Sequence, residues 1–211
     1  DDASVTVVEF FDYNCGYCKK AFEDVRAVLE SDKDVRVAFM EMPILGPASA
    51  DIARWSLASE KQGKYFEYHT ALMEHKGSKN EAKLKELAKG VGLDVEQLEK
   101  DANSDEIKAT IAKKVKFAQG LGVSGTPAFV INKELVRGYM GVEGLKAKIQ
   151  DYYSYKVIYK KAIQKIDMCY FLLEEDFNLL SSLVKHKAVW KSNIYPTLDY
   201  YIDHLSSHNF S

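Results

Sequence analysis

A pair of cysteines separated by two residues lies where a strand-like segment meets a helix-like segment. Residues 5–11 form a nearly continuous run of β-branched and aromatic residues, which is typical of a strand covered on both faces. After this run, apolar residues recur at the spacing of one helix face: Cys18, Phe22, Val25 and Leu29. The chain must therefore fold so that a buried strand leads into a helix with Cys15 at its start.

The expected place of Cys15 gives it a chemical role. A helix N-terminus carries unpaired backbone N–H groups and the positive end of the helix dipole, and both favour a thiolate, the form that attacks disulfides. Cys18 lies one turn later on the apolar face, so it is expected to be the shielded thiol that resolves a mixed disulfide. Gly16 and Tyr17 stand between the two sulfurs and are expected to tune their reactivity.

Zinc binding is the main alternative for such a pair. A structural zinc site needs four ligands, and the rest of the chain offers Cys169 and five histidines, none of which forms a second C-x-x-C or a C-x-x-H. The strand-to-helix setting therefore favours redox chemistry, and we expect no metal and no cofactor.

A second motif lies far along the chain. Residues 120–127 are rich in turn formers and end in Thr126-Pro127, and residues 128–131 read as a strand. Proline is tolerated at the start of a strand, and its peptide bond can be cis at low cost. Taken alone, this dipeptide fits an ordinary turn equally well.

The two motifs together resemble the thioredoxin fold, and specifically its DsbA-like branch. The resemblance covers residues 1–150 and implies an α/β thioredoxin fold and a thiol-disulfide oxidoreductase. It also implies that Pro127 is cis and faces Cys15 and Cys18. Thr126 would then offer its backbone groups to an extended client segment.

Glu9 is a third position that matches this family. A carboxylate within an apolar strand is costly unless it is paired or protonated, so its pKa is expected to be raised. Family members carry an acid six residues before the first cysteine, which is taken to relay a proton to the buried thiol. The alternative is that Glu9 faces solvent at the end of the strand.

The remaining pattern predicts an inserted helical subdomain. A second strand is expected at residues 35–42, helices from residue 48 to about 119, with a capping box at Ser78–Glu81, and a closing helix at about 145–150. The resulting division assigns residues 1–47 and 119–150 to the thioredoxin-like domain. Residues 48–118 form the insertion, and residues 151–211 form a helical C-terminal extension.

The C-terminal extension has no counterpart in the resemblance. Its apolar residues alternate in spacing between four and three, which predicts a heptad seam along residues 159–184 and a homo-oligomer. A helical hairpin folded back on its own domain fits equally well, and a fusion origin stays open. His204 and His208 stand four residues apart and could clasp a metal, although terminal polar residues usually face water, and Cys169 reads as a small buried hydrophobe.

Composition restricts the classes of partner. A formal net charge of −2 gives no sign of nucleic-acid binding, and no apolar run approaches the length of a membrane span. The chain opens at Asp1 without a leader, so we expect that a signal peptide has been removed. The resemblance implies the bacterial periplasm, with cysteine-containing client proteins and a membrane redox partner that resets the pair.

The most specific prediction is whether the protein rearranges the disulfides of its clients or introduces them. Cys-Gly-Tyr-Cys with Thr126 before the proline resembles the isomerase-type members and the copper-tolerance relatives more than the dedicated oxidases, so a disulfide isomerase is favoured. A dithiol oxidase is the alternative within the same chemistry. An alternative of another class is a redox-sensitive chaperone or binding module whose two cysteines hold a soft ion such as Cu(I).

Overall fold

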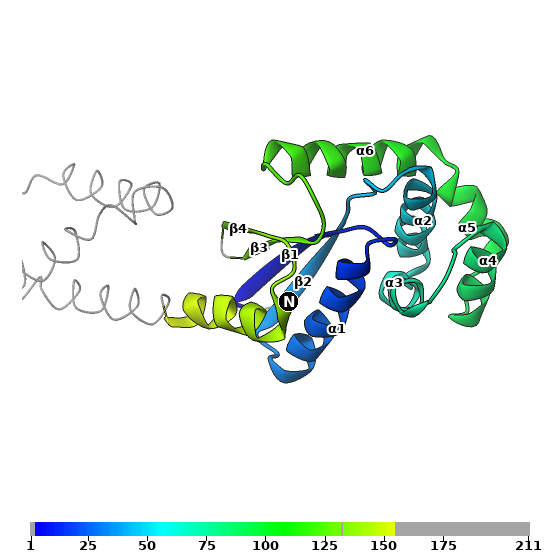
Figure 1. Ribbon diagram of the computed structural model, residues 1–211. Coiled ribbons are helices and arrows are strands. Elements are labelled where there is room, and N and C mark those ends of the chain that lie inside the picture. Colours follow the sequence, from blue (N-terminus) through cyan, green and yellow to red (C-terminus); the bar gives the residue numbers. More distant parts are fainter. Residues whose placement is uncertain (1–2, 132, 155–211) are drawn as a thin grey trace, which may run out of the picture. The chain divides into compact units, whose positions relative to one another are not determined.

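The computed structural model describes residues 3–131 and 133–154. They belong almost entirely to the first of two compact units of the chain, Asp1–Tyr153. This part contains a sheet with the strand order β2-β1-β3-β4, formed by β1 (Val5–Phe11), β2 (Val35–Glu41), β3 (Ala128–Ile131) and β4 (Glu134–Arg137). β1 runs parallel to β2 and antiparallel to β3, and β4 is antiparallel to β3 (Figure 1).

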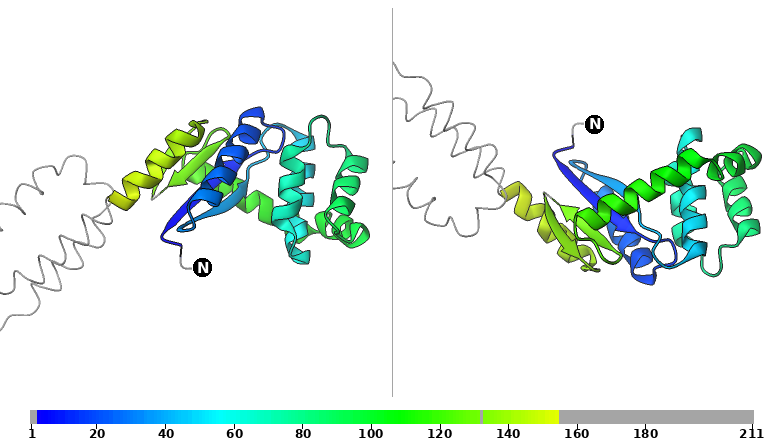
Figure 2. Two further views of the ribbon diagram at one scale, coloured as in Figure 1. Left: turned by 90° about the horizontal axis from the view of Figure 1, so that it is seen from below. Right: turned by 90° about the horizontal axis from the view of Figure 1, so that it is seen from above.

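Helices cover both faces of this sheet, as the two views in Figure 2 show. Helix α1 (Gly16–Ser31) and a last helix over residues 141–154 cover one face, where Val7 packs with Val25 and Leu145. Helix α6 (Asp105–Gly120) covers the other face, where Phe10 packs with Ala118. Coverage on both faces explains the continuous apolar run of β1 and confirms the predicted α/β thioredoxin fold.

A helical insertion separates β2 from β3. It consists of α2 (Pro47–Ala58), the 3₁₀ turn η1 (Ser59–Gln62), α3 (Tyr65–Glu74), α4 (Glu81–Gly90), α5 (Val95–Ala102) and α6. Its core, with Trp55 and Leu72, is continuous with Phe11, Cys18 and Phe22. The insertion therefore packs over the end of the sheet from which the cysteines emerge.

Two element boundaries differ from the sequence prediction. The predicted capping box at Ser78 is wrong by two residues, because the side chain of Asn80 caps α4 and accepts a hydrogen bond from the Lys83 backbone N–H at 3.0 Å. Asparagine caps a helix as well as serine does, so Ser78 and Asn80 were both possible N-caps, and α4 begins after the second. The last helix begins at residue 141 rather than 145, because Val142 joins the packed cluster under the sheet. The heptad seam, Cys169, His204 and His208 lie outside the described residues.

Candidate active site

The two cysteines stand at the start of α1. Cys15 is its N-cap, and the Cys15 sulfur accepts a hydrogen bond from the Cys18 backbone N–H at 3.4 Å. Cys15 is partly exposed, whereas Cys18 is 0% exposed, and both are free thiols. Burial raises the pKa of Cys18, and the neighbouring Cys15 raises it further. The pair thus combines an accessible sulfur with a shielded thiol that holds its proton.

Thr126 and Pro127 lie beside this pair. The Thr126–Pro127 peptide bond is cis, and the Cys15 thiol donates to the Thr126 carbonyl oxygen at 3.4 Å. The Pro127 carbonyl in turn accepts the Gly138 N–H at 2.9 Å, which ties this loop to the end of β4. Residues more than a hundred positions apart in the sequence therefore form one site.

Glu9 is buried within the sheet, so the alternative of a solvent-facing carboxylate is wrong. It is 0% exposed, and within the described part of the chain neither carboxylate oxygen has a hydrogen-bond partner. Burial raises its pKa from 4.5 to about 8. A carboxyl group with this pKa exchanges its proton close to neutral pH.

The place of Glu9 follows from strand alternation. Val7, Glu9 and Phe11 share one face of β1, because side chains alternate along a strand. Val7 packs with Val25 of α1, whereas Phe11 belongs to the cluster that contains Cys18. Glu9 therefore lies between these contacts, under the first turns of the helix that carries both cysteines.

Side chains that the sequence analysis did not single out hold the loop before Cys15. The Oδ1 of Asp12 accepts the Asn14 N–H and the Ser49 hydroxyl, each at 2.8 Å, and its Oδ2 accepts the Leu45 N–H at 3.0 Å. The first contact is an Asx turn, which the spacing of Asp12 and Asn14 could have suggested. The contacts with Ser49 and Leu45 join the loop to the insertion.

Tyr13 anchors the same loop from its other side. Its hydroxyl lies 2.7 Å from Nδ1 of His69, and its carbonyl oxygen accepts the ammonium of Lys79 at 3.0 Å. Burial lowers the pKa of His69 to about 3, so the ring is neutral in the folded protein. The positions of these partners give no pattern along the chain that sequence reading could detect.

The residues between the cysteines are open to solvent. Tyr17 is 59% exposed, and its ring lies 5.9 Å from the ring of Tyr139. A side-chain carbon added at Gly16 would meet no atom within 4 Å. Cys15 is thus approached across a surface that a polypeptide can reach.

Among residues 3–131 and 133–154, no group of three or more His, Cys, Asp or Glu side chains is arranged to hold a metal ion. The same residues contain no helix long and apolar enough to cross a membrane.

Residues 6–150 match the model of the DSBA-like thioredoxin domain family. The chain belongs to this family. Among solved structures, it is similar to a thioredoxin-like oxidoreductase from Silicibacter pomeroyi, with 42% identity, a TM-score of 0.69 and coverage of 72% of this chain and 88% of that one. It is also similar to the thiol-disulfide exchange protein alpha-DsbA2 from Wolbachia pipientis, with 30% identity, a TM-score of 0.67 and coverage of 72% and 83%.

Two kinds of curated protein are among the relatives of this chain. A Na⁺/H⁺ antiporter, NhaA 1 of Salinispora arenicola, is 31% identical over 70% of this chain, and the match spans only 23% of the antiporter. Disulfide bond formation protein D of Bacillus subtilis is 25% identical over 71% of this chain and 73% of its own length. The chain thus spans about a quarter of the length of the antiporter and about three quarters of the length of disulfide bond formation protein D.

Proposed function

We propose that this chain is a thiol-disulfide oxidoreductase that exchanges disulfides with client proteins. The observation that carries the proposal is the pairing of a partly exposed Cys15 at a helix N-terminus with a fully buried Cys18, with the Thr126 carbonyl 3.4 Å from the Cys15 sulfur. Membership of the DsbA-like family and similarity to the alpha-DsbA2 structure support it.

Cys15 performs the first step. Its thiolate attacks one sulfur of a client disulfide, so that a bond forms between Cys15 and the client while the client S–S bond breaks and the second client sulfur leaves as a thiolate. The Thr126 carbonyl, 3.4 Å from the Cys15 sulfur, is placed to accept a backbone N–H of the extended client segment. Pro127 keeps that carbonyl beside the sulfur.

Cys18 performs the second step when the client is to be released reduced. The Cys18 thiol gives up its proton and attacks the Cys15 sulfur, which forms the Cys15–Cys18 disulfide and expels the second client thiolate. Because the Cys18 pKa is raised by burial, this step needs a proton acceptor. Glu9, whose pKa is raised to about 8, is the acceptor here and the donor in the reverse direction.

Isomerisation is the direction that we propose for this chemistry. In an isomerase the released client thiolate attacks a different client disulfide, and a client sulfur finally displaces Cys15, so no net oxidation occurs. The exposed Gly16-Tyr17 dipeptide and Thr126 touch or flank the Cys15 sulfur, and they resemble those of isomerase-type members. The chain is proposed to act outside the cytoplasm, in a bacterial periplasm, with a membrane partner resetting its cysteines.

Dithiol oxidation is the second candidate. Disulfide bond formation protein D of Bacillus subtilis, which this chain matches over 73% of that protein, favours it. An oxidase differs from an isomerase in starting from the Cys15–Cys18 disulfide and passing it to a reduced client.

Two assays on the full chain distinguish the candidates. One measures recovery of activity from a scrambled, fully oxidised client with the reduced protein, and the other measures recovery from a reduced client with the oxidised protein. We expect the first rate to exceed the second. A chain that oxidises rapidly and does not reshuffle would overturn isomerisation, and one that does neither while binding Cu(I) stoichiometrically would favour the copper-binding alternative.

A further inference from the structure

A cavity of about 590 Å³ opens in the helical insertion next to the loop that carries Cys15. Its walls come from α2, from the segment leading into α4, from α4 and from the end of α5, and one wall includes Asn14. In Figure 1 the loop between β1 and α1 reaches the insertion beside α2. The cavity size is within the range of sites that hold a small ligand or a few residues of a peptide.

Residues that line the cavity are linked to the loop before Cys15 through the backbone and through hydrogen bonds. Asn14 precedes Cys15 in the chain, and consecutive Cα atoms are only about 3.8 Å apart. The Asn14 side chain donates to the Ser49 hydroxyl at 2.9 Å, which fixes it against α2. Lys79, which lines the cavity and is 7% exposed, donates to the Tyr13 carbonyl at 3.0 Å. The wall of the cavity that includes Asn14 is therefore adjacent in the chain to the cysteine that bonds a client.

The lining suits a polypeptide better than a single ion. Ile52, Trp55 and Leu84 are buried apolar residues that line the cavity. Its polar lining includes three asparagines, and each uses one amide group inside the protein: Nδ2 of Asn14 donates to Ser49, Oδ1 of Asn80 caps α4, and Nδ2 of Asn103 donates to the Glu99 carbonyl. The other half of each amide is left to bond a peptide backbone. Most of the lining is polar or charged, and such a lining can hold a peptide backbone through hydrogen bonds while the apolar residues close the cavity floor.

The charges that line the cavity are largely balanced. The Asp51 carboxylate pairs with Arg54, and Lys85 lies 2.8 Å from both Glu81 and Glu99. Lys85, which is not itself a lining residue, offsets one of these two glutamates, and Lys79, whose pKa burial lowers to about 8, supplies the second positive charge. A strongly charged ligand is thus not favoured, and the neutral backbone of a client is.

We propose that this cavity is a second client subsite, which holds the part of an extended client segment that lies a few residues from the cysteine bonded to Cys15. The inference rests on the proposed exchange function and adds where the client is held. Because the mixed disulfide makes binding in the cavity intramolecular, even weak contacts there raise the occupancy of the productive complex.

Blocking the cavity tests this subsite. Ala48 lines it, is exposed and lies in the first turn of α2, so Ala48→Trp fills the cavity without disturbing the core. Ala109→Trp is the matched control, because Ala109 is also an exposed helical alanine and does not line the cavity. The substrates are oxidised glutathione and a series of disulfide-linked peptides lengthened on either side of the cysteine.

For wild-type protein we expect kcat/KM to rise with peptide length. Ala48→Trp should lower the value for the long peptides about tenfold, which corresponds to roughly 1.4 kcal/mol of lost binding. It should leave glutathione exchange unchanged, and Ala109→Trp should alter neither substrate. Equal rates for long and short peptides, or long-peptide rates untouched by Ala48→Trp, would overturn the subsite while glutathione exchange kept the proposed function intact. Failure of wild-type protein with every disulfide would overturn both.

A trapped complex gives an independent readout. Cys18→Ser protein is linked through Cys15 to a long peptide that carries a photoreactive residue at successive positions. Crosslinks to Trp55 or Leu84 from positions a few residues away from the peptide cysteine support the subsite. Crosslinks confined to Tyr17 and Tyr139 would overturn it.

Discussion

At the scale of single residues, Glu9 should make stability depend on pH. The unfolded carboxyl has a pKa of 4.5 and the folded one about 8, so between these values the folded state binds more protons than the unfolded state. The free energy of unfolding therefore falls as pH rises through this window, by up to roughly 5 kcal/mol. Urea unfolding of the full chain between pH 5 and pH 8 measures this slope.

Glu9→Gln supplies the comparison for that slope. Glutamine cannot ionise, so the variant should lose most of the decline and be more stable than wild type near pH 8. It should also slow the resolution of a mixed disulfide near neutral pH, because Cys18 loses its proton acceptor. If the free energies of unfolding of the two proteins change with pH in parallel, ionisation of Glu9 does not cause the decline. If the mixed disulfide is resolved at the same rate in both, Glu9 has no part in the mechanism.

The sequence identified the site residues whose role depends on their neighbours in the chain. It missed the residues whose role depends on contacts with distant parts of the chain. The N-cap position of Cys15 and the burial of Cys18 follow from the junction of two adjacent patterns. Asp12, Tyr13 and Lys79 became functional candidates only in the structure, because their partners other than Asn14 lie 33 to 66 positions away in the chain. A sequence pattern reports periodicity, and it carries no record of which distant side chain completes a hydrogen bond.

At the scale of elements, α6 is tied to β2 by a buried charge. The carboxylate of Glu41 is 1% exposed, accepts the Tyr65 hydroxyl at 2.6 Å and pairs with Lys114 of α6. Lys114→Met should destabilise the protein by about 2–3 kcal/mol, because it leaves a buried carboxylate without its cation. Urea unfolding checks the value, and the double variant with Glu41→Gln should regain part of the loss.

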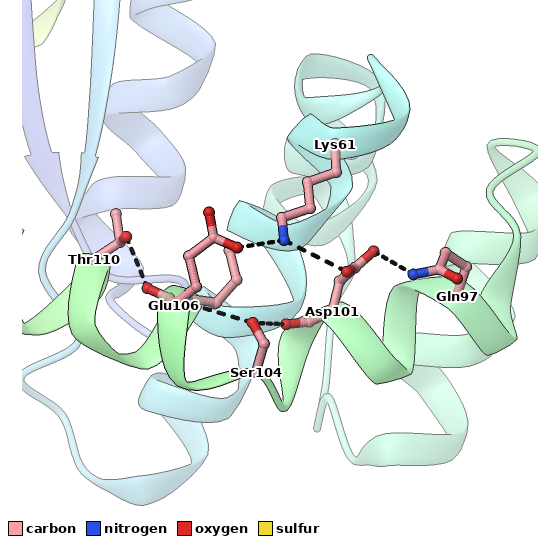
Figure 3. A network of polar contacts seen from close by, with 7 residues as sticks. Lys61, Gln97, Asp101, Ser104, Glu106 and Thr110 are labelled. Carbon is pink, nitrogen blue, oxygen red and sulfur yellow. Dashed lines mark hydrogen bonds and ion pairs between the residues drawn. The ribbon is translucent and has the colours of Figure 1, made fainter.

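Lys61 provides a matched lysine at the surface. It joins η1 to Asp101 and Glu106 in the network of Figure 3, where Lys61 and Glu106 are exposed and Asp101 is partly buried. Because water and salt screen exposed pairs, Lys61→Met should change stability too little to resolve. Equal losses for Lys61→Met and Lys114→Met would contradict the importance of burial at Glu41.

Element existence was easier to predict from sequence than element ends. The first strand followed from a continuous β-branched and aromatic run, and α1 followed from apolar residues at helical spacing. The start of α4 was misplaced because Ser78 and Asn80 are both good caps, and only packing of the following turn decides between them. The last helix was predicted too short because its first turn packs through few apolar residues.

At the scale of the whole molecule, we predict that residues beyond 153 supply association. The apolar residues of 159–184 follow a heptad spacing, which favours pairing between copies of a helix. A chain ending after Tyr153 keeps the first compact unit, including the Tyr153 hydroxyl bond to Asp32 at 3.0 Å. We expect light scattering to give an oligomer for the full chain and a monomer for the shorter one.

Isomerase activity should follow the same comparison. If association holds the client for reshuffling, the shorter chain should lose recovery of a scrambled client and keep exchange with glutathione. A monomeric full chain, or the same number of subunits for both lengths, would remove association from the account.

The central claim is that Cys15 attacks clients and Cys18 resolves the resulting bond, and trapping tests it most directly. Cys15→Ser, Cys18→Ser and the double variant are mixed with an oxidised client, quenched in acid and analysed by mass spectrometry without reductant. The account predicts a covalent complex through Cys15 in Cys18→Ser and none in the other two variants. A complex formed by Cys15→Ser instead, or by none of the three while wild-type protein exchanges, would contradict it.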